Sequence, residues 1–262
     1  MSIVDFSLEG KLALITGGSK GIGRATALAY AENGADVAIA SRGKEELEAT
    51  AKEVEAYGRR VVAIPTDVSN ETELRALYDQ TVSELGGVDI LINNAGAGNS
   101  QPLEEITPKD FELGMRINVA SALHLSQLCR QSMKQRGGGV IINVASDDAL
   151  RPSPGIGIYS TAKAALVHLT KHMAAEWGAD GIRVLAISPG LVRTHMARGI
   201  CKYIEGQGDK AKLNPLRNKI GEPEEIAGAM LLAASPAGGY LNGGNIVLDG
   251  GTQAMMPVQI DW

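Results

Sequence analysis

Residues 12–23, LALITGGSKGIG, are the stretch that decides the fold. The first five residues are mostly apolar and too few for a helix, so they predict a buried parallel strand. A glycine-rich turn follows directly, and then a helical pattern over 24–33 that Gly34 stops. Residues 36–40 are largely apolar again and predict a second strand. The sequence therefore predicts a βαβ unit with a glycine-rich turn at the carboxyl end of its first strand.

Strands and helices continue to alternate along the chain. Further strands are expected at 61–64, 89–92, 140–144, 184–187 and 246–248, and further helices at 44–57, 71–85, 108–135 and from about Tyr159 to Trp177. This alternation predicts an α/β fold with a doubly wound, seven-stranded parallel sheet and helices on both faces. Without a linker, repeat or low-complexity segment, residues 1–262 are expected to form a single domain. The polar segment 191–219 interrupts the rhythm and is expected to be a small lid over the carboxyl ends of the strands.

Composition and charge limit the partners and the compartment. A net charge of -5 argues against nucleic acid as the main partner and against a basic membrane-binding face. The first residues lack a secretion signal, and no apolar run reaches the roughly 20 residues of a membrane span. Cys129 and Cys201 are far apart and outside any ligand spacing, which favours a reducing compartment. We therefore expect a soluble, cytoplasmic protein that takes a small-molecule substrate.

Tyr159 and Lys163 are the first candidates for chemistry. On a helix they lie four residues apart on one face. An adjacent ammonium favours the phenolate and is expected to lower the tyrosine pKa from about 10, which suits general acid-base catalysis near neutral pH. Ser146, thirteen residues earlier, is a candidate to bind the substrate oxygen. Alone, this pattern occurs by chance in many soluble proteins and is more typical of a partly buried tyrosine and a solvated lysine.

Six motifs together resemble the classical short-chain dehydrogenase/reductase family over essentially the whole chain. They are Thr16-Gly17-(x3)-Gly21-Ile22-Gly23, Asn93-Asn94-Ala95-Gly96, Asn118, Ser146, Tyr159-(x3)-Lys163 and Pro189-Gly190-(x3)-Thr194. Each motif alone is weak, and their order on the expected strands and turns carries the resemblance. It implies a Rossmann fold and a catalytic set in which Tyr159 exchanges the proton and Lys163 lowers its pKa and binds the nicotinamide ribose. In the same set Ser146 binds the substrate oxygen and Asn118 supports a water relay.

The resemblance also implies a set of residues around a nicotinamide dinucleotide. They are Gly17, Ser19, Lys20, Gly21, Ile22, Gly23, Ser41, Arg42, Asp67, Val68, Asn94, Ala95, Gly96, Tyr159, Lys163, Pro189, Gly190, Val192 and Thr194. The glycines of the first turn let the backbone approach a pyrophosphate at a helix N-terminus. Asp67 and Val68 are expected at the adenine, 94–96 near a ribose, and 189–194 at the nicotinamide amide.

The end of the second strand bears on the choice of cofactor. A carboxylate there would bind both ribose hydroxyls and favour NAD(H). The sequence has Ser41 and Arg42 instead, with Lys20 in the glycine turn. Two cations converging on a 2′-phosphate predict a preference for NADP(H). The alternative is that both cations are solvated, which leaves an NAD(H)-preferring alcohol or polyol dehydrogenase.

Several further residues carry hypotheses of their own. Asp148, after the serine, is a candidate to bind a hydroxyl-rich or cationic substrate group, with solvent exposure or turn capping as the alternative. His195 in the lid is a candidate substrate contact, whereas His168 and His172 lack a third metal ligand, so no metal is expected. The resemblance implies a homotetramer, with a homodimer as the alternative.

Substrate and activity stay open at this stage. The candidates are ketones, sugars or polyols, and 3-oxoacyl thioesters, and a non-catalytic nucleotide sensor on the same fold is the second function class. The apolar tail 255–262 is expected either to pack on a neighbouring subunit or to close over a pocket.

Overall fold

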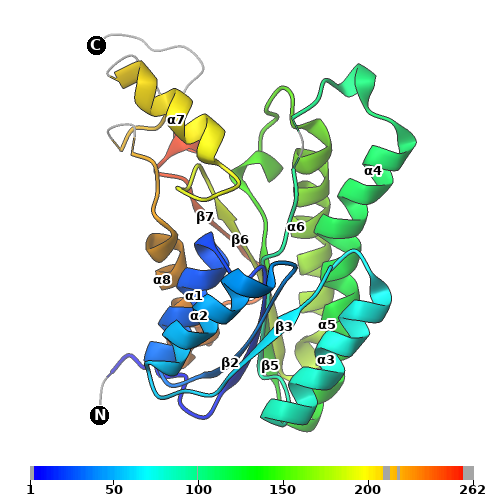
Figure 1. Ribbon diagram of the computed structural model, residues 1–262, viewed down its shortest axis with the longest axis vertical. Helices are drawn as coiled ribbons and strands as arrows, with labels where there is room; N and C mark the ends of the chain where they lie inside the picture. Colours follow the sequence, from blue (N-terminus) through cyan, green and yellow to red (C-terminus); the bar gives the residue numbers. More distant parts are fainter. Residues whose placement is uncertain (1–2, 99, 209–212, 217–218, 256–262) are drawn as a thin grey trace.

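A parallel sheet forms the centre of the protein, as the computed structural model, which describes residues 3–98, 100–208, 213–216 and 219–255, shows in Figure 1. Seven strands in this part of the chain pair in the order β3-β2-β1-β4-β5-β6-β7. They are β1 Leu12–Thr16, β2 Asp36–Ser41, β3 Val61–Pro65, β4 Ile90–Asn93, β5 Gly139–Val144, β6 Ile182–Pro189 and β7 Asn245–Leu248. Every pair is parallel, so the predicted doubly wound sheet is confirmed.

Helices cover both faces of this sheet (Figure 1). They are α1 Gly21–Glu32, α2 Lys44–Glu55, α3 Glu71–Leu85, α4 Pro108–Met115, α5 Ser121–Gln135, α6 Gly157–Trp177, α7 Arg198–Gln207 and α8 Pro223–Ala234. One buried cluster joins β-strand residues such as Ile15 to α1, α2 and α8, and a second joins residues such as Leu14 to α3, α5 and α6. Neighbouring residues of β1 thus face opposite layers, which explains why the parallel strands are apolar throughout.

The expected helix over 108–135 is interrupted. α4 and α5 are joined by a π-helical turn, η2 Arg116–Ala120, with buried Asn118 at its centre. Asn118 Nδ2 donates to the carbonyl of Gly114 at 2.9 Å, the carbonyl that the Asn118 backbone N–H would bind in an unbroken α-helix. This competition between side chain and backbone is the local reason for the turn.

The segment 191–219 is more structured than its composition predicted, because it contains α7 (Figure 1). Its two ends are joined by a parallel bridge between Val192 and Gly221. Arg193 adds ion pairs to Glu205 on α7 and, at 3.0 Å, to Glu222 beyond the segment. These contacts fix the base of the segment beside the carboxyl end of β6. The predicted tail lies outside the described residues from position 256 onward.

Candidate active site

The carboxyl ends of five strands bring the predicted residues to one edge of the sheet. β1 ends at the glycine turn, β2 ends at Ser41, β4 is followed by Asn94, β5 leads to Ser146 and β6 ends at Pro189. β1 pairs with β2 on one side and with β4 on the other, so the direction of strand order changes there. Ligands of open α/β sheets bind at such a switch point.

Thr16 and Asn94 tie the glycine turn to the end of β4. Thr16 Oγ1 accepts the backbone N–H groups of Asn94 and Ala95, both at 3.0 Å. Asn94 Nδ2 in turn donates to the carbonyls of Thr16 at 2.9 Å and Gly17 at 3.2 Å. A Cβ on Gly23 would collide with the Gly17 carbonyl and lie 2.6 Å from Asn94 Nδ2. The turn therefore requires glycine here to bring α1 against β1.

Three features of this edge fit a nicotinamide dinucleotide. Gly17 and Gly21 have φ angles of 66° and 53°, which shape the turn before α1. Lys20, the N-cap residue of α1, makes no side-chain capping bond, so its side chain does not satisfy the first N–H groups of the helix. Ser41 Oγ is buried without a hydrogen-bond partner among the described residues, at the end of β2. An anion at the helix N-terminus and a polar group beside Ser41 would satisfy both.

Tyr159 and Lys163 lie one turn apart near the start of α6. Lys163 is buried, and its Nζ donates to the carbonyl of Val144 at 2.7 Å. The same nitrogen lies 5.6 Å from the centre of the Tyr159 ring. α6 therefore directs the Lys163 ammonium at the end of β5, while the Tyr159 ring lies next to Gly98 in the segment after β4.

Burial raises the pKa of Tyr159 to about 12; hydrogen bonding to Ser146 opposes the rise, and repulsion from Asp148 and Asp147 adds to it. Burial also lowers the pKa of Lys163 to about 8. The prediction that Lys163 lowers the pKa of Tyr159 is therefore wrong for this structure. The loss of solvation around the phenol raises that pKa, and the Lys163 ammonium donates to a backbone carbonyl instead of to the phenol oxygen. The phenol is protonated at neutral pH.

Asn118 reaches the same site from the π-helical turn. Its Nδ2 donates to the carbonyl of Ala97 at 2.9 Å, and its Oδ1 accepts the Ala97 N–H at 3.3 Å. Gly96 lies between this amide and Lys163, since a Cβ on Gly96 would lie 2.9 Å from Asn118 Oδ1 and 3.3 Å from Lys163 Nζ. The side chains of Asn118 and Lys163 thus share one corner of the site.

Ser146 is bound to the carboxylates that follow it. Its Oγ donates toward Asp148 Oδ2 at 3.3 Å and Asp147 Oδ1 at 3.4 Å, and accepts the Asp148 N–H at 3.2 Å. Ser153 Oγ donates to the other Asp148 oxygen. The carboxylate of Asp148 is therefore engaged by two serine hydroxyls, whereas the turn is capped by the Ser146 side chain. The predicted substrate contact of Asp148 stays a proposal.

Asp147 is the most buried carboxylate of this group, at 7% exposure. Burial raises its pKa to about 6, with repulsion from Asp148 as the next cause and Arg151 opposing it. Asp249 adds further repulsion, and a Cβ on Gly190 would lie 2.8 Å from Asp249 Cα and 3.5 Å from Asp147 Oδ2. Three carboxylates, those of Asp147, Asp148 and Asp249, therefore concentrate negative charge near Ser146.

The predicted lid, 191–219, reaches the glycine turn through Thr194. Thr194 Cγ2 lies 3.1 Å from where a Cβ on Gly21 would be, and its Oγ1 accepts the Ala197 N–H at 3.3 Å. Val192 is buried in the bridge to Gly221. His195 is exposed beside Arg198, and it lies close enough to Glu46 for its charge to lower the pKa of that carboxyl. The predicted substrate contact of His195 stays a proposal.

The predicted adenine and phosphate contacts have partners of their own. Asp67 accepts the backbone N–H of Ser69 at 2.9 Å and its hydroxyl at 2.8 Å, and these bonds lower the pKa of Asp67, with a small contribution from exposed Arg42. Val68 is half-buried. Lys20 forms an ion pair with Glu46 at 2.7 Å and so does not point freely to solvent.

Two residues of this edge escaped the sequence analysis. Thr16 belongs to the motif of the first turn, but its role in binding the end of β4 depends on the sheet order. Glu46 stands in a run of charges that is typical of a solvated helix face. Its position opposite Lys20 follows only from the packing of α2 beside the turn.

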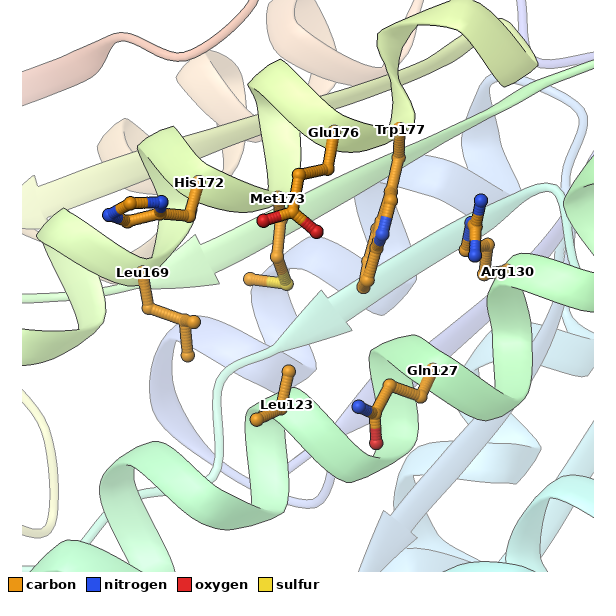
Figure 2. Close-up of a pocket in the computed structure, with 8 residues that line it drawn as sticks. All are labelled: Leu123, Gln127, Arg130, Leu169, His172, Met173, Glu176 and Trp177. Carbon is orange, nitrogen blue, oxygen red and sulfur yellow. The ribbon is translucent and has the colours of Figure 1, made fainter.

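A separate hollow of about 350 Å³ lies on the outer face of α5 and α6 (Figure 2). Its walls include Leu123, Leu169 and Trp177, and Arg130 lies over the Trp177 ring at 5.5 Å. His172, also on this wall, packs edge-to-face on His168 at 5.0 Å between ring centres. This hollow lies on the opposite side of the helix pair from β5 and carries none of the proposed catalytic residues.

Known proteins match this chain over most of its length. The family described as Enoyl-(Acyl carrier protein) reductase matches residues 17–253. The 7alpha-hydroxysteroid dehydrogenase of Escherichia coli K12 is 36% identical over 244 residues, 93% of this chain and 94% of that protein. None of the helices in the described part of the chain is long and apolar enough to cross a membrane.

Two solved structures extend the comparison. A 7 alpha-hydroxysteroid dehydrogenase complexed with NADH and 7-oxo glycochenodeoxycholic acid is 35% identical, with a TM-score of 0.90, and the match covers 96% of this chain and 97% of the other. The L-sorbose reductase of Gluconobacter frateurii, complexed with NADPH and L-sorbose, is 32% identical, with a TM-score of 0.90, and the match covers 96% and 100%.

Proposed function

The chain belongs to the short-chain dehydrogenase/reductase family, and we propose that it is an NADP(H)-dependent oxidoreductase that interconverts a carbonyl and a secondary alcohol. The observation that carries the proposal is the convergence of four side chains from different elements. Asn118 comes from η2, Ser146 follows β5, and Tyr159 and Lys163 come from α6. The bound nicotinamide would supply or accept the hydride.

Tyr159 exchanges the proton in this proposal. Its phenol is protonated at neutral pH, so it is ready to donate to the oxygen of a carbonyl during reduction, and the phenolate accepts the proton back during oxidation. Ser146 donates its hydroxyl to the same oxygen, and to do so it must turn from Asp148 and Asp147 toward the substrate. Lys163 and Asn118, at their shared corner, support the return of the proton through water.

NADP(H) is the proposed cofactor because β2 ends in Ser41 followed by Arg42, with no acid at either position. An arginine there can bind a 2′-phosphate through two parallel hydrogen bonds. The NADPH complex of L-sorbose reductase is consistent with this choice. The NADH complex of 7 alpha-hydroxysteroid dehydrogenase keeps the NAD(H)-preferring alternative in view.

The proposed substrate is a small carbonyl or alcohol compound, with sugars and polyols, steroids and 3-oxoacyl thioesters as the classes to test. The two most direct supports are the relatives that act on a hydroxysteroid and on L-sorbose. The negative charge of the carboxylates of Asp147, Asp148 and Asp249 near Ser146 favours neutral, hydroxyl-rich substrates over anionic ones.

We further propose that the chain works as one domain with 191–219 as its lid, and that it assembles as a homotetramer or homodimer through α5 and α6. The support for assembly is the hollow of Figure 2, where Leu123 and Leu169 lie among polar side chains such as Gln127 on an outer helix face. Cytoplasmic location stays a prediction from the two cysteines, which are unpaired in the structure.

The test combines cofactor binding with turnover on a panel of ketones, sugars and 3-oxoacyl esters, followed by the reduced-nicotinamide absorbance. Tyr159→Phe removes the proton donor and is expected to lower kcat by roughly 10²- to 10⁴-fold, while the Kd for NADPH changes little. Tyr240→Phe, at a fully exposed tyrosine between α8 and β7, is the control and should retain activity. Equal turnover in Tyr159→Phe would refute the assignment, and cofactor binding without turnover on any substrate would favour the nucleotide sensor.

A further inference from the structure

β2 ends without an acidic residue, but the carboxylate of Glu46 on α2 lies close to the segment that follows this strand. Glu46, in the first turn of α2, places its Oε1 2.7 Å from Lys20 Nζ in the glycine turn. Its other oxygen lies over Gly43, where a Cβ would collide with it. Glu46 therefore stands between two segments that the sequence separates by more than twenty residues.

The carboxylate of Glu46 is held in its ionised form by its neighbours and stays accessible to solvent. The hydrogen bond from Lys20 lowers its pKa, and His195 of the lid contributes in the same direction. Both partners of the ion pair are about half exposed, with 48% of the Lys20 side chain and 45% of the Glu46 side chain accessible. The pair is thus accessible to a ligand that enters from the edge of the sheet, and it can be opened at modest expense.

We propose that Glu46 sets the balance between NADP(H) and NAD(H) by binding Lys20, an inference that rests on the proposed function. The carboxylate neutralises one of the two cations expected at a 2′-phosphate and repels the phosphate directly. Toward a 2′-hydroxyl the same carboxylate is a hydrogen-bond acceptor. Glu46 accordingly weakens NADP(H) binding and favours NAD(H), and Arg42 supplies the cation that Glu46 does not bind.

The experiment measures the Kd values of NADPH and NADH by calorimetry, independently of turnover. Glu46→Gln keeps the shape of the side chain and releases Lys20, so the ratio of Kd(NADH) to Kd(NADPH) is expected to rise roughly three- to tenfold at low salt. The rise should shrink at high salt, because both partners are exposed. Glu48→Gln is the matched control, since Glu48 pairs with Lys44 at 3.7 Å on the same helix.

A second pair of variants separates release of Lys20 from simple loss of charge. In a Lys20→Ala background, Glu46→Gln is expected to change the ratio by less than half of its effect in the wild-type background. The same change in both backgrounds would overturn the role of Lys20, and a ratio that moves no more in Glu46→Gln than in Glu48→Gln would overturn the role of Glu46. Failure of the wild-type protein to bind either cofactor would instead overturn the proposed function, and this proposal with it.

Discussion

Asp147 is predicted to lower the stability of the protein at neutral pH. Its pKa rises from an ordinary 3.8 to about 6 in the folded state, because its carboxylate is buried beside Asp148 and Asp249. The folded state therefore binds this proton more tightly than the unfolded state. Stability falls as pH rises from about 4 to about 6, and the full loss remains above that range. At about 1.36 kcal/mol for each pKa unit, the loss amounts to about 3 kcal/mol.

Asp147→Asn keeps the shape and removes the charge, so this variant should be more stable than wild type by up to about 3 kcal/mol at pH 8. The advantage should shrink below pH 6 and disappear near pH 3, below both pKa values, where Asp147 is protonated in both states. The assay is urea unfolding followed by circular dichroism across this pH range, at one protein concentration because assembly contributes to stability. Asp79→Asn, an exposed carboxylate on α3, is the control. An advantage that does not depend on pH, or a wild type more stable at pH 8, would refute the reasoning.

Two further predictions follow from the glycine turn and the helix pair. Gly23→Ala should lose about 1–3 kcal/mol in thermal unfolding, because its Cβ would collide with the Gly17 carbonyl, whereas Gly228→Ala has open space on α8 and should gain about 0.5–1 kcal/mol. Equal effects would contradict this contrast. Leu169→Glu, on the wall of the hollow in Figure 2, should reduce the assembly to a smaller species in light scattering, while Tyr203→Ser on α7 should not. An unchanged mass for Leu169→Glu would contradict assembly through this face.

The sheet could be predicted from the sequence because its strands are buried on both faces. Each of the seven apolar runs became a strand, with bounds that differ from those expected by at most two residues at either end. The glycine stops worked for a similar local reason: Gly86, for example, ends α3 with a φ angle of 99°, which few other residues adopt. Local sequence was sufficient wherever local geometry decided the outcome.

Contacts between segments that lie far apart along the chain could not be predicted from the sequence. One such contact is the second bond of the Asn118 amide, to the carbonyl of Ala97 twenty-one residues away. The ion pair of Lys20 with Glu46 spans twenty-six residues, so counting cations near the glycine turn overlooked the anion that packs against one of them. The predicted direction of the Tyr159 pKa shift was wrong for the same reason, because the spacing of two residues on a helix does not indicate how much solvent the fold removes from the phenol. α8 was missed as well, although Pro223 at its first turn is a typical start signal.

The position of Asn118 depends on the number of residues in the π-helical turn η2. One residue advances an α-helix by about 100° and about 1.5 Å, so the residue that η2 absorbs sets the rotation of α4 relative to α5. Deleting a single residue within 116–120 would let an unbroken helix form and swing α4 and the segment before it around the axis, with α5 still packed through Leu125. Among relatives of this chain, an insertion or deletion of one residue at this point would displace Asn118 more surely than most substitutions of its neighbours.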